Sequence, residues 1–239
     1  MKVLVLGASG ATGKYLVKHL LEKGHEVVAI VRSLDSLRNE SANHSKLKVY
    51  VGTALDMAKE DLQKILLDCD AVASCLGHNL SFKGLYGRPW MLVRDSVRRV
   101  CKLVQVIPEK KIRFVLMNTS GNRNGNLHEP VSFGQHMVLF LLRLLLPPHL
   151  DNERAADYLR VGIGKHNSNI EWVVVRPDTL IDSEEVSEYE NFPSPIRSAI
   201  FDAGTVSRTN VAHFMMSLLD DAELWEKWRG QMPLVYNKE

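Results

Sequence analysis

The first residues of the chain hold its most constraining feature, an apolar segment that runs directly into three glycines at three-residue spacing. Val3 to Leu6 has the continuous apolar character of a buried parallel strand, and apolar residues recur at helical spacing after Gly13. Gly7, Gly10 and Gly13 therefore fall at a turn from strand to helix. Glycine there permits a tight turn and lets backbone N–H groups approach an anion. Because the helix N-terminus adds partial positive charge, the pattern predicts a site for the pyrophosphate of a dinucleotide.

The glycine spacing is Gly-x-x-Gly-x-x-Gly, which differs from the Gly-x-Gly-x-x-Gly of the best-known dinucleotide fingerprint. The alternative is an ordinary glycine-rich turn at the start of an α/β domain. The order of strand, turn, helix and second strand favours the phosphate site. We expect the cofactor to contact the residues of the turn, namely Gly7, Ser9, Gly10, Ala11, Thr12 and Gly13.

Strand-like and helical segments alternate along the rest of the chain. The expected strands are Val3–Leu6, Glu26–Val31, Leu47–Val51, Ala71–Ser74, Arg113–Met117, Trp172–Val175 and Leu234–Tyr236. The expected helices are Ala11–Glu22, Lys59–Leu67, Met91–Val106, Phe133–Leu146, Asn152–Lys165 and Asn210–Leu219. Continuous apolar strands between helices are typical of a parallel sheet covered on both faces. The sequence therefore predicts one α/β domain over residues 1–239, a doubly wound parallel sheet with a small C-terminal elaboration.

Charge and cysteine usage exclude several classes of protein. The formal net charge is +2 with both signs interspersed, so nucleic acid is not an expected partner. Cys69, Cys75 and Cys101 lack metal-type or Cys-x-x-Cys spacing, which suits buried, reduced thiols. Because the first strand begins almost at Met1, there is no room for a signal peptide, and we expect a cytoplasmic protein.

Residues 137–146 form the most apolar stretch, which is interrupted by Arg143 and ends at Pro147-Pro148. It is too short for the roughly 20 residues of a membrane span. Because it is apolar nearly all round, we expect a helix that is buried or that faces a second copy of the chain or a protein partner. Contact with a membrane surface is the alternative.

Arg32 directly follows the second expected strand, where NAD-binding proteins commonly carry an acidic residue for the ribose hydroxyl. A guanidinium group can hold the 2′-phosphate of NADP, with Ser33 and Arg38 as further donors. The alternative is a solvated surface arginine. The position of Arg32 predicts that NADP(H) is preferred over NAD(H).

The segment after the fourth expected strand is a second candidate part of the site. Gly77 gives the cofactor access to the backbone, and His78 is either an acid or base near neutral pH or a polar loop residue. Phe82, Tyr86 and Trp90 either wall an apolar pocket or pack against the next helix.

Four strand ends resemble those of the atypical short-chain dehydrogenase/reductase family, in the NAD(P)-binding branch of biliverdin reductase B (flavin reductase) and NmrA-like proteins. The matching motifs are Gly7 to Gly13, Val31-Arg32, Asn118-Thr119-Ser120 and Val174-Val175-Arg176-Pro177. The resemblance implies a Rossmann fold, cofactor contacts at Thr119 and Pro177, and Ser120 beside the nicotinamide. There Ser120 hydrogen-bonds the substrate or the carboxamide of the cofactor, or is simply a turn serine that satisfies backbone groups.

The chain departs from that family in its acid–base residues. The usual Tyr-x-x-x-Lys pair is missing, because Tyr158 is followed four residues later by Gly162. Tyrosine-driven alcohol–ketone chemistry is therefore not expected. The leading hypothesis is an NADPH-dependent reductase of a small-molecule substrate such as a flavin or quinone, which accepts hydride while solvent supplies the proton. The alternatives are a non-enzymatic NADP-binding redox sensor or assembly protein and, third, a classical dehydrogenase or sugar-nucleotide epimerase.

Overall fold

A computed structural model of the chain describes residues 1–34, 44–78, 81, 85–127, 129 and 132–238. Within these residues the centre of the fold is an eight-stranded sheet in the order β3-β2-β1-β4-β5-β6-β10-β8. The strands are β1 (Lys2–Leu6), β2 (Glu26–Val31), β3 (Leu47–Val51), β4 (Ala71–Ser74), β5 (Ile112–Met117), β6 (Ile170–Pro177), β8 (Tyr189–Phe192) and β10 (Leu234–Asn237). All neighbouring strands are parallel except β10 and β8. The predicted parallel sheet is confirmed.

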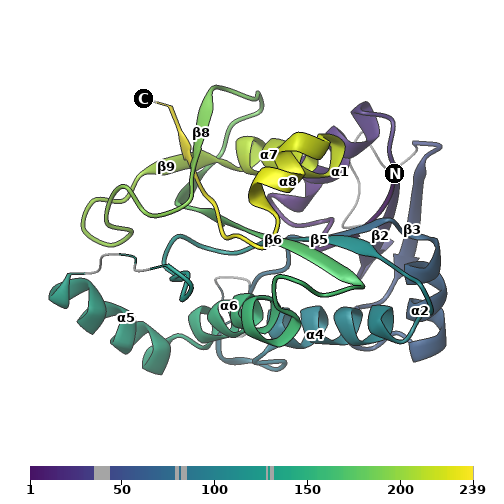
Figure 1. Cartoon of the computed structure of the whole chain (residues 1–239), viewed down its shortest axis with the longest axis horizontal. Coiled ribbons are helices and arrows are strands. Elements are labelled where there is room, and N and C mark those ends of the chain that lie inside the picture. Colours follow the sequence, from purple (N-terminus) through teal and green to yellow (C-terminus); the bar gives the residue numbers. More distant parts are fainter. Residues whose placement is uncertain (35–43, 79–80, 82–84, 128, 130–131, 239) are drawn as a thin grey trace.

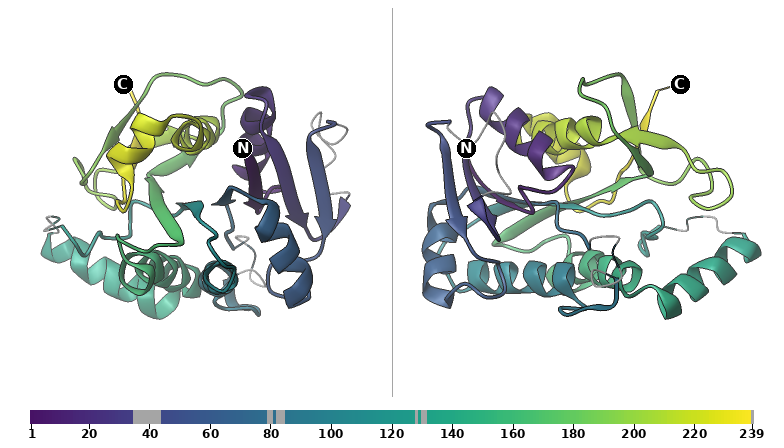
Figure 2. Two further views of the ribbon diagram at one scale, coloured as in Figure 1. Left: turned by 45° about the vertical axis from the view of Figure 1, so that its right-hand side comes forward. Right: turned by 180° about the vertical axis from the view of Figure 1, so that it is seen from behind.

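Successive residues of the strands pack against helices on opposite faces of the sheet. Val3 and Val5 join the apolar cluster under α1 (Gly13–Glu22), α7 (Arg208–Asp220) and α8 (Ala222–Trp228). Leu4 and Leu6 join the cluster over α2 (Lys59–Asp68), α4 (Leu92–Gln105) and α6 (Pro147–Asp157). Figures 1 and 2 show these two helical layers on either side of the sheet. Because both faces are covered, the doubly wound, Rossmann-like architecture is confirmed.

The direction of chain progression across the sheet reverses at β1. From β1 the chain runs outward through β2 to β3, and it then returns to place β4 on the other side of β1. In doubly wound sheets, ligands bind outside the carboxyl ends of the strands at such a reversal. We therefore expect the ligand site to be formed by the segments that follow β1, β4, β5 and β6.

The C-terminal elaboration is built from short elements. β7 (Thr179–Ile181) and β9 (Thr205–Ser207) form a separate parallel pair, and β8 closes the edge of the main sheet beside β10. The sequence pattern does not predict β7, β8, β9 or α8. Strands of three or four residues with mixed polarity carry too little periodicity to be recognised.

The helix expected at 152–165 begins earlier and changes form. α6 starts at Pro147, and its continuation, Tyr158–Ile163, is a π-helix. Proline is favoured in a first helical turn because its missing N–H has no intrahelical partner there. The early start places His149 and Asp151 in the first turns of α6.

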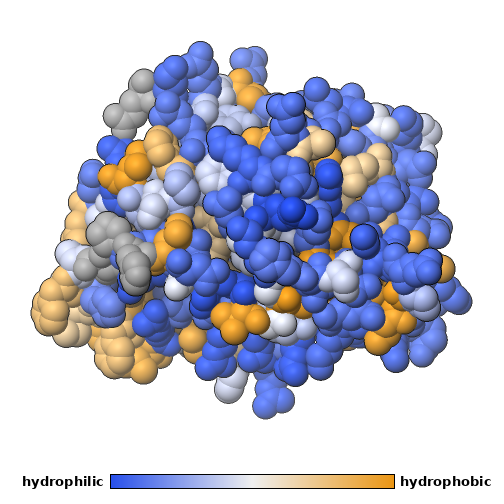
Figure 3. All heavy atoms as spheres, viewed as in Figure 1, coloured by the Kyte–Doolittle hydropathy of each residue, from blue (hydrophilic) through white to orange (hydrophobic). Residues whose placement is uncertain are grey.

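Of the alternatives expected for residues 137–146, burial within the chain is not seen in the described residues, while a helix that faces a second copy or a protein partner stays a prediction. Within α5 (Phe133–Leu145) the buried residue is Leu139. The exposed apolar side chains of this helix are Phe133, Met137, Phe140, Leu141, Leu144 and Leu145. The helix projects from the carboxyl edge of the sheet, where only one side of it meets other elements, and apolar residues gather over this end of the molecule (Figures 1 and 3). None of the described helices is long and apolar enough to cross a membrane.

Candidate functional site

The turn after β1 has the geometry that its glycines predict. Gly7 has a φ of +77°, and a Cβ on it would lie 2.7 Å from the carbonyl oxygen of Cys75. A Cβ on Gly13 would overlap the carbonyl oxygen of Gly7, so strand and helix pack as closely as glycine permits. The backbone N–H of Gly10 donates to that same Gly7 oxygen at 2.9 Å. The turn is tight, and its conformation depends on glycine at positions 7 and 13.

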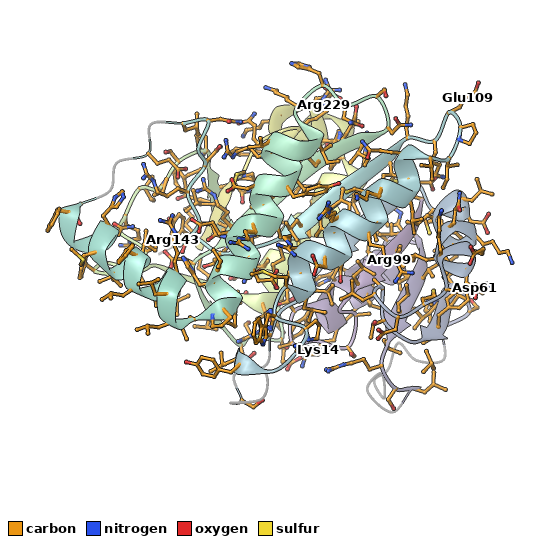
Figure 4. The ribbon with its side chains drawn as sticks, turned by 90° about the horizontal axis from the view of Figure 1, so that it is seen from below. Lys14, Asp61, Arg99, Glu109, Arg143 and Arg229 are labelled. Atoms are coloured by element: carbon orange, nitrogen blue, oxygen red, sulfur yellow. The ribbon has the colours of Figure 1, made fainter. Side chains whose placement is uncertain are left out.

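The N-terminus of α1 is open toward an anion. Thr12 is the N-cap residue, but its side chain caps no backbone N–H, and the first turn of α1 contains no acidic residue. Ser9 and Ala11 are exposed, while Lys14 extends from the first turn with its side chain in solvent (Figure 4). Partial positive charge, accessible backbone and a nearby ammonium group fit a pyrophosphate at this end of the helix.

Arg32 lies just beyond the carboxyl end of β2 with its side chain exposed, next to the exposed Ser33. This is the strand adjacent to β1, so the guanidinium group is on the side of the turn where the adenosine half of a dinucleotide lies in Rossmann-like proteins. Arg38 lies outside the described residues. The contact of Arg32 with a 2′-phosphate stays a prediction.

The segment after β4 borders the glycine turn. Its Cys75 and Leu76 backbone atoms lie against Gly7, within 3.0 Å of where a Cβ would be placed. Gly77 is exposed, and no atom lies within 4 Å of the position of a Cβ on it. The space beside Gly77, next to the glycine turn, is therefore open. This is expected if Gly77 lets the cofactor approach the backbone.

His78 has an orienting partner that is not evident from the sequence. Its Nε2 donates to Asp151 Oδ2 at 2.8 Å, and both side chains are buried. The same carboxylate accepts the backbone N–H groups of Val93 at 2.8 Å and Arg94 at 2.9 Å. Asp151 thus joins the end of β4, the start of α4 and the first turns of α6. The two residues are 73 positions apart, so no local motif signals the pair.

The β5 end is tied to α6 by a hydrogen bond from Asn118 Nδ2 to the carbonyl oxygen of Asn152 at 2.9 Å. Asn118 Oδ1 also accepts the backbone N–H of Thr119 at 2.9 Å. Thr119 is partly exposed, and its Oγ1 accepts the N–H of Gly121 at 3.3 Å. The turn that follows β5 is therefore held in one conformation beside the start of α6.

Ser120 is 8% exposed, and its Oγ donates to Asp178 Oδ1 at 3.1 Å. Asp178 also accepts the N–H groups of Thr179 and Gly204, and burial raises the pKa of its carboxyl group. The N–H of Ser120 donates to the carbonyl oxygen of Pro177 at 2.8 Å, and Pro177 is itself buried. Asp178 is a carboxylate partner of Ser120 that the sequence pattern does not predict. Among the described residues no imidazole is hydrogen-bonded to the Ser120 hydroxyl, so a serine–histidine pair is not formed.

Arg176 is fully buried and pairs with Glu129 at 2.7 Å. Its guanidinium group also donates to the carbonyl oxygens of Asn122 and Met232, at 2.8 and 2.7 Å. These bonds fix the loop after β5 to the end of β6. The arginine of the Arg-Pro motif therefore anchors the loop that borders the site.

Tyr158 directly follows α6 and lines a shallow hollow of about 410 Å³ that shares no residue with the glycine turn. The hollow is lined by Arg94, Arg98, Arg154, Asp157, Tyr158 and Gly162. Burial raises the pKa of Tyr158, and no lysine stands four residues later.

The aromatic residues after β4 are exposed rather than gathered around a closed pocket. Tyr86 donates its hydroxyl to the carbonyl oxygen of Leu145 at 3.1 Å, at the end of α5, and Trp90 Nε1 donates to the carbonyl oxygen of Tyr86. Phe82 lies outside the described residues. The three cysteines are buried free thiols, and the described residues form no cluster suited to a metal ion.

Comparison with known proteins also indicates a dinucleotide-binding domain. A family model described as NAD(P)H-binding matches residues 7–222. A UDP-glucose 4-epimerase of Streptococcus mutans is 27% identical over 129 residues, which are 52% of this chain and 37% of the epimerase. The chain spans less than half the length of the curated relatives it matches.

Solved structures share the whole fold at low identity. A short-chain dehydrogenase/reductase of Veillonella parvula in complex with NADP is 18% identical, with a TM-score of 0.69 over 99% of this chain and 94% of that one. A candidate NADH-flavin reductase of Streptococcus pneumoniae is 20% identical, with a TM-score of 0.68 and complete coverage of both chains. At such identities the likeness shows the fold alone.

Proposed function

The chain belongs to the NAD(P)H-binding family, and we propose that it is an NADPH-dependent reductase that transfers hydride to a flat acceptor such as a flavin or a quinone. The observation that carries this proposal is the open phosphate turn at the reversal of the sheet, where the ends of β1 and β4 meet. The turn binds the pyrophosphate, and Gly77, Thr119 and Pro177 border the rest of the cofactor. When bound, the nicotinamide supplies hydride to the acceptor.

The acceptor class follows from the acid–base residues of this chain. A ketone or alcohol substrate needs a positioned acid, and the tyrosine–lysine pair that serves elsewhere is missing. Flavins and quinones accept hydride into a conjugated ring and can take their proton from solvent. The structural similarity to the candidate flavin reductase of S. pneumoniae supports the same class.

Preference for NADPH rests on Arg32. Its exposed guanidinium group at the end of β2 replaces the acidic residue that would bind an unmodified ribose. The similar protein of V. parvula was solved with NADP, whereas the similar protein of S. pneumoniae is described as an NADH-flavin reductase, so the proposed preference rests on Arg32 alone.

Ser120 acts by positioning. Its hydroxyl group donates to Asp178 and its N–H donates to Pro177, so it joins the ends of β5 and β6 beside the nicotinamide position. In this role Ser120 and Thr119 orient the nicotinamide or the acceptor, and no covalent intermediate forms on Ser120.

Consumption of NADPH in the presence of a panel of flavins and quinones tests the proposal. We expect oxidation of NADPH that depends on the added acceptor and saturates with its concentration. Tight binding of NADPH without turnover of any acceptor would contradict it. A Gly10→Val variant serves as the control, because loss of cofactor binding should abolish the acceptor-dependent rate.

A non-enzymatic NADP-binding protein is the second candidate function, and the exposed apolar face of α5 favours it. Six apolar side chains of that helix are in solvent, which is typical of a surface that binds a partner or a second copy of the chain. Such a sensor would bind NADPH, consume none, and change its association with the partner through residues 137–146.

A further inference from the structure

The first turn of α6 is fixed against the strand ends by contacts from three directions. Asp151 accepts from His78 and from two backbone N–H groups of α4, and the carbonyl oxygen of Asn152 accepts from Asn118 at the end of β5. Pro147 and Pro148 restrict the backbone at the start of the helix. This turn is therefore a rigid part of the site, on the same edge of the sheet as the glycine turn.

His149, in that same turn, has a polar atom that these contacts leave unsatisfied. Its Nε2 is buried and has no hydrogen-bond partner among the described residues. The ring lies against the β5 turn, with Cε1 3.5 Å from the position of a Cβ on Gly121. Buried polar atoms nearly always have partners, and an exception in a rigid turn beside a candidate site indicates a missing ligand group.

The charge state of His149 limits what it can donate. Burial lowers the pKa of its imidazole, while Glu153 opposes this effect and Arg143 adds to it. Arg143, on α5 (Figure 4), is paired with Glu153 through two hydrogen bonds, so the effects of these two charges on the ring largely offset one another. At neutral pH the imidazole is neutral, and one ring nitrogen carries a proton.

We propose that His149 is a catalytic residue whose Nε2–H donates a hydrogen bond to a carbonyl oxygen of the acceptor. This inference rests on the proposed reductase function and assigns to His149 the role of hydrogen-bond donor to the acceptor. Hydride from NADPH brings two electrons to the acceptor, negative charge develops on its carbonyl oxygen, and the Nε2–H stabilises that charge. A proton from solvent then completes the reduced acceptor, while His149 keeps its own proton.

His78 and Asp151 are positioning residues in this scheme. The carboxylate holds His78 and the α4 N-terminus, and through the helix backbone it fixes the direction of the His149 ring. Loss of Asp151 would move the imidazole without removing it. The effect would appear in the rate constant for reduction more than in the affinity for NADPH.

The test is His149→Phe, which keeps an aromatic ring of similar shape but removes the unpaired nitrogen. We expect the unfolding midpoint to stay the same or rise, because an apolar ring replaces a buried unpaired polar atom. The dissociation constant of NADPH should stay within about twofold, while kcat with FMN or a water-soluble benzoquinone should fall tenfold or more, in line with the loss of one preorganised donor. His149→Gln, which can still donate, should recover part of the rate.

The matched control is His25→Phe, at the amino edge of the sheet. His25 is also buried, but both of its ring nitrogens have partners, the N-terminal amine and Asp220. This variant should be less stable than the unmodified protein and retain its rate constants. A structural role for His149 predicts the same behaviour for His149→Phe, and that result would overturn the inference.

A spectroscopic measurement gives a readout apart from activity. With ¹⁵N-labelled histidine, the Nε2 resonance of His149 should shift when FMN is added to the protein saturated with NADP⁺, and that of His25 should not. Lack of any shift, or equal kcat for the unmodified and His149→Phe proteins, would reject the role of His149 alone. If the unmodified protein reduces no flavin or quinone, the proposed function fails and this inference fails with it.

Discussion

The carbonyl oxygen of Gly7 occupies the space that a side chain at position 13 would need. Gly7 is in turn held against the backbone of Cys75, so the ends of β1, α1 and β4 meet with no side chain between them. Gly10 differs, because the one atom near its Cβ position is the Gly7 oxygen at 3.1 Å. Gly7 and Gly13 are therefore required for packing, whereas Gly10 has open space beside it, where the proposed pyrophosphate would bind.

This difference predicts separate effects of substitution. Gly10→Val should leave the domain folded and abolish NADPH binding, since the branched side chain fills the pyrophosphate space. Gly13→Ala should instead lower the free energy of unfolding, by about 1–3 kcal/mol as for other overpacked sites. Circular dichroism with denaturant and fluorescence titration with NADPH measure the two effects separately. A folded Gly10→Val protein with normal NADPH affinity would show that the turn is not the phosphate site.

Arg32→Asp should reverse the cofactor preference. The unmodified protein should bind NADPH more tightly than NADH, because a guanidinium–phosphate contact contributes about 1.5–3 kcal/mol, roughly 10- to 150-fold in affinity. The aspartate would repel the 2′-phosphate and accept the ribose hydroxyls. Titrations with both cofactors at one ionic strength decide the question, and equal affinities in the unmodified protein would exclude this role for Arg32.

Breaking the pair of Arg176 and Glu129 should destabilise the fold. Both side chains are buried, so Glu129→Leu leaves a guanidinium charge without its carboxylate and should cost about 3–5 kcal/mol. The double variant Arg176→Met with Glu129→Leu should recover much of that loss, because no charge then remains buried. Urea denaturation of the single and double variants measures this coupling. Equal destabilisation by the double variant would mean that the backbone contacts of Arg176 dominate.

The sequence predicted those parts of the fold and site that local patterns determine. The segment from Val3 to Gly13 combines a strand, three glycines and a helix within a few residues, and its geometry is as expected. The pairing of His78 with Asp151 depends on two distant helices meeting one strand end, so spacing could not reveal it. The apolar sequence of α5 left burial and a partner-facing surface both open, because apolarity shows that a surface needs cover but not whether the same chain provides it, and the structure excludes burial within the described chain. Pro147-Pro148 is a start signal that could have placed α6 correctly.

Buried histidines should make stability fall with acidification. Burial lowers the pKa of His19, His25, His149 and His213 from the ordinary value of 6.5. The unfolded chain therefore takes up protons first as the pH drops below about 6.5, and the free energy of unfolding decreases. Asp178 acts in the opposite sense, since burial raises its pKa and favours the protonated folded form at low pH.

The contribution of one histidine can be isolated with His19→Gln. Glutamine can still hydrogen-bond Thr209 but does not titrate, so the variant should lose less stability than the unmodified protein between pH 7.5 and 5. Guanidinium denaturation at several pH values gives the two slopes. Parallel slopes would show that His19 titrates alike in the folded and unfolded chains.

Ser120→Ala should reduce the rate of NADPH oxidation only modestly. The serine hydroxyl is engaged with Asp178, and no imidazole is hydrogen-bonded to it in the described part of the chain, so it lacks the general base that a nucleophile requires. Loss of one positioning hydrogen bond contributes roughly 0.5–1.5 kcal/mol, about a two- to twelvefold decrease in rate. Ser168→Ala is the matched control, because the Ser168 hydroxyl also donates to a side-chain oxygen, Asn169 Oδ1 at 2.9 Å, but it precedes β6 at the opposite end of the strands, and its removal should leave the rate unchanged. Single-turnover oxidation of NADPH compares the three proteins directly. A decrease of several orders of magnitude for Ser120→Ala, or a covalent adduct on Ser120, would contradict hydride transfer to a positioned acceptor. Either result would instead indicate that Ser120 is a nucleophile.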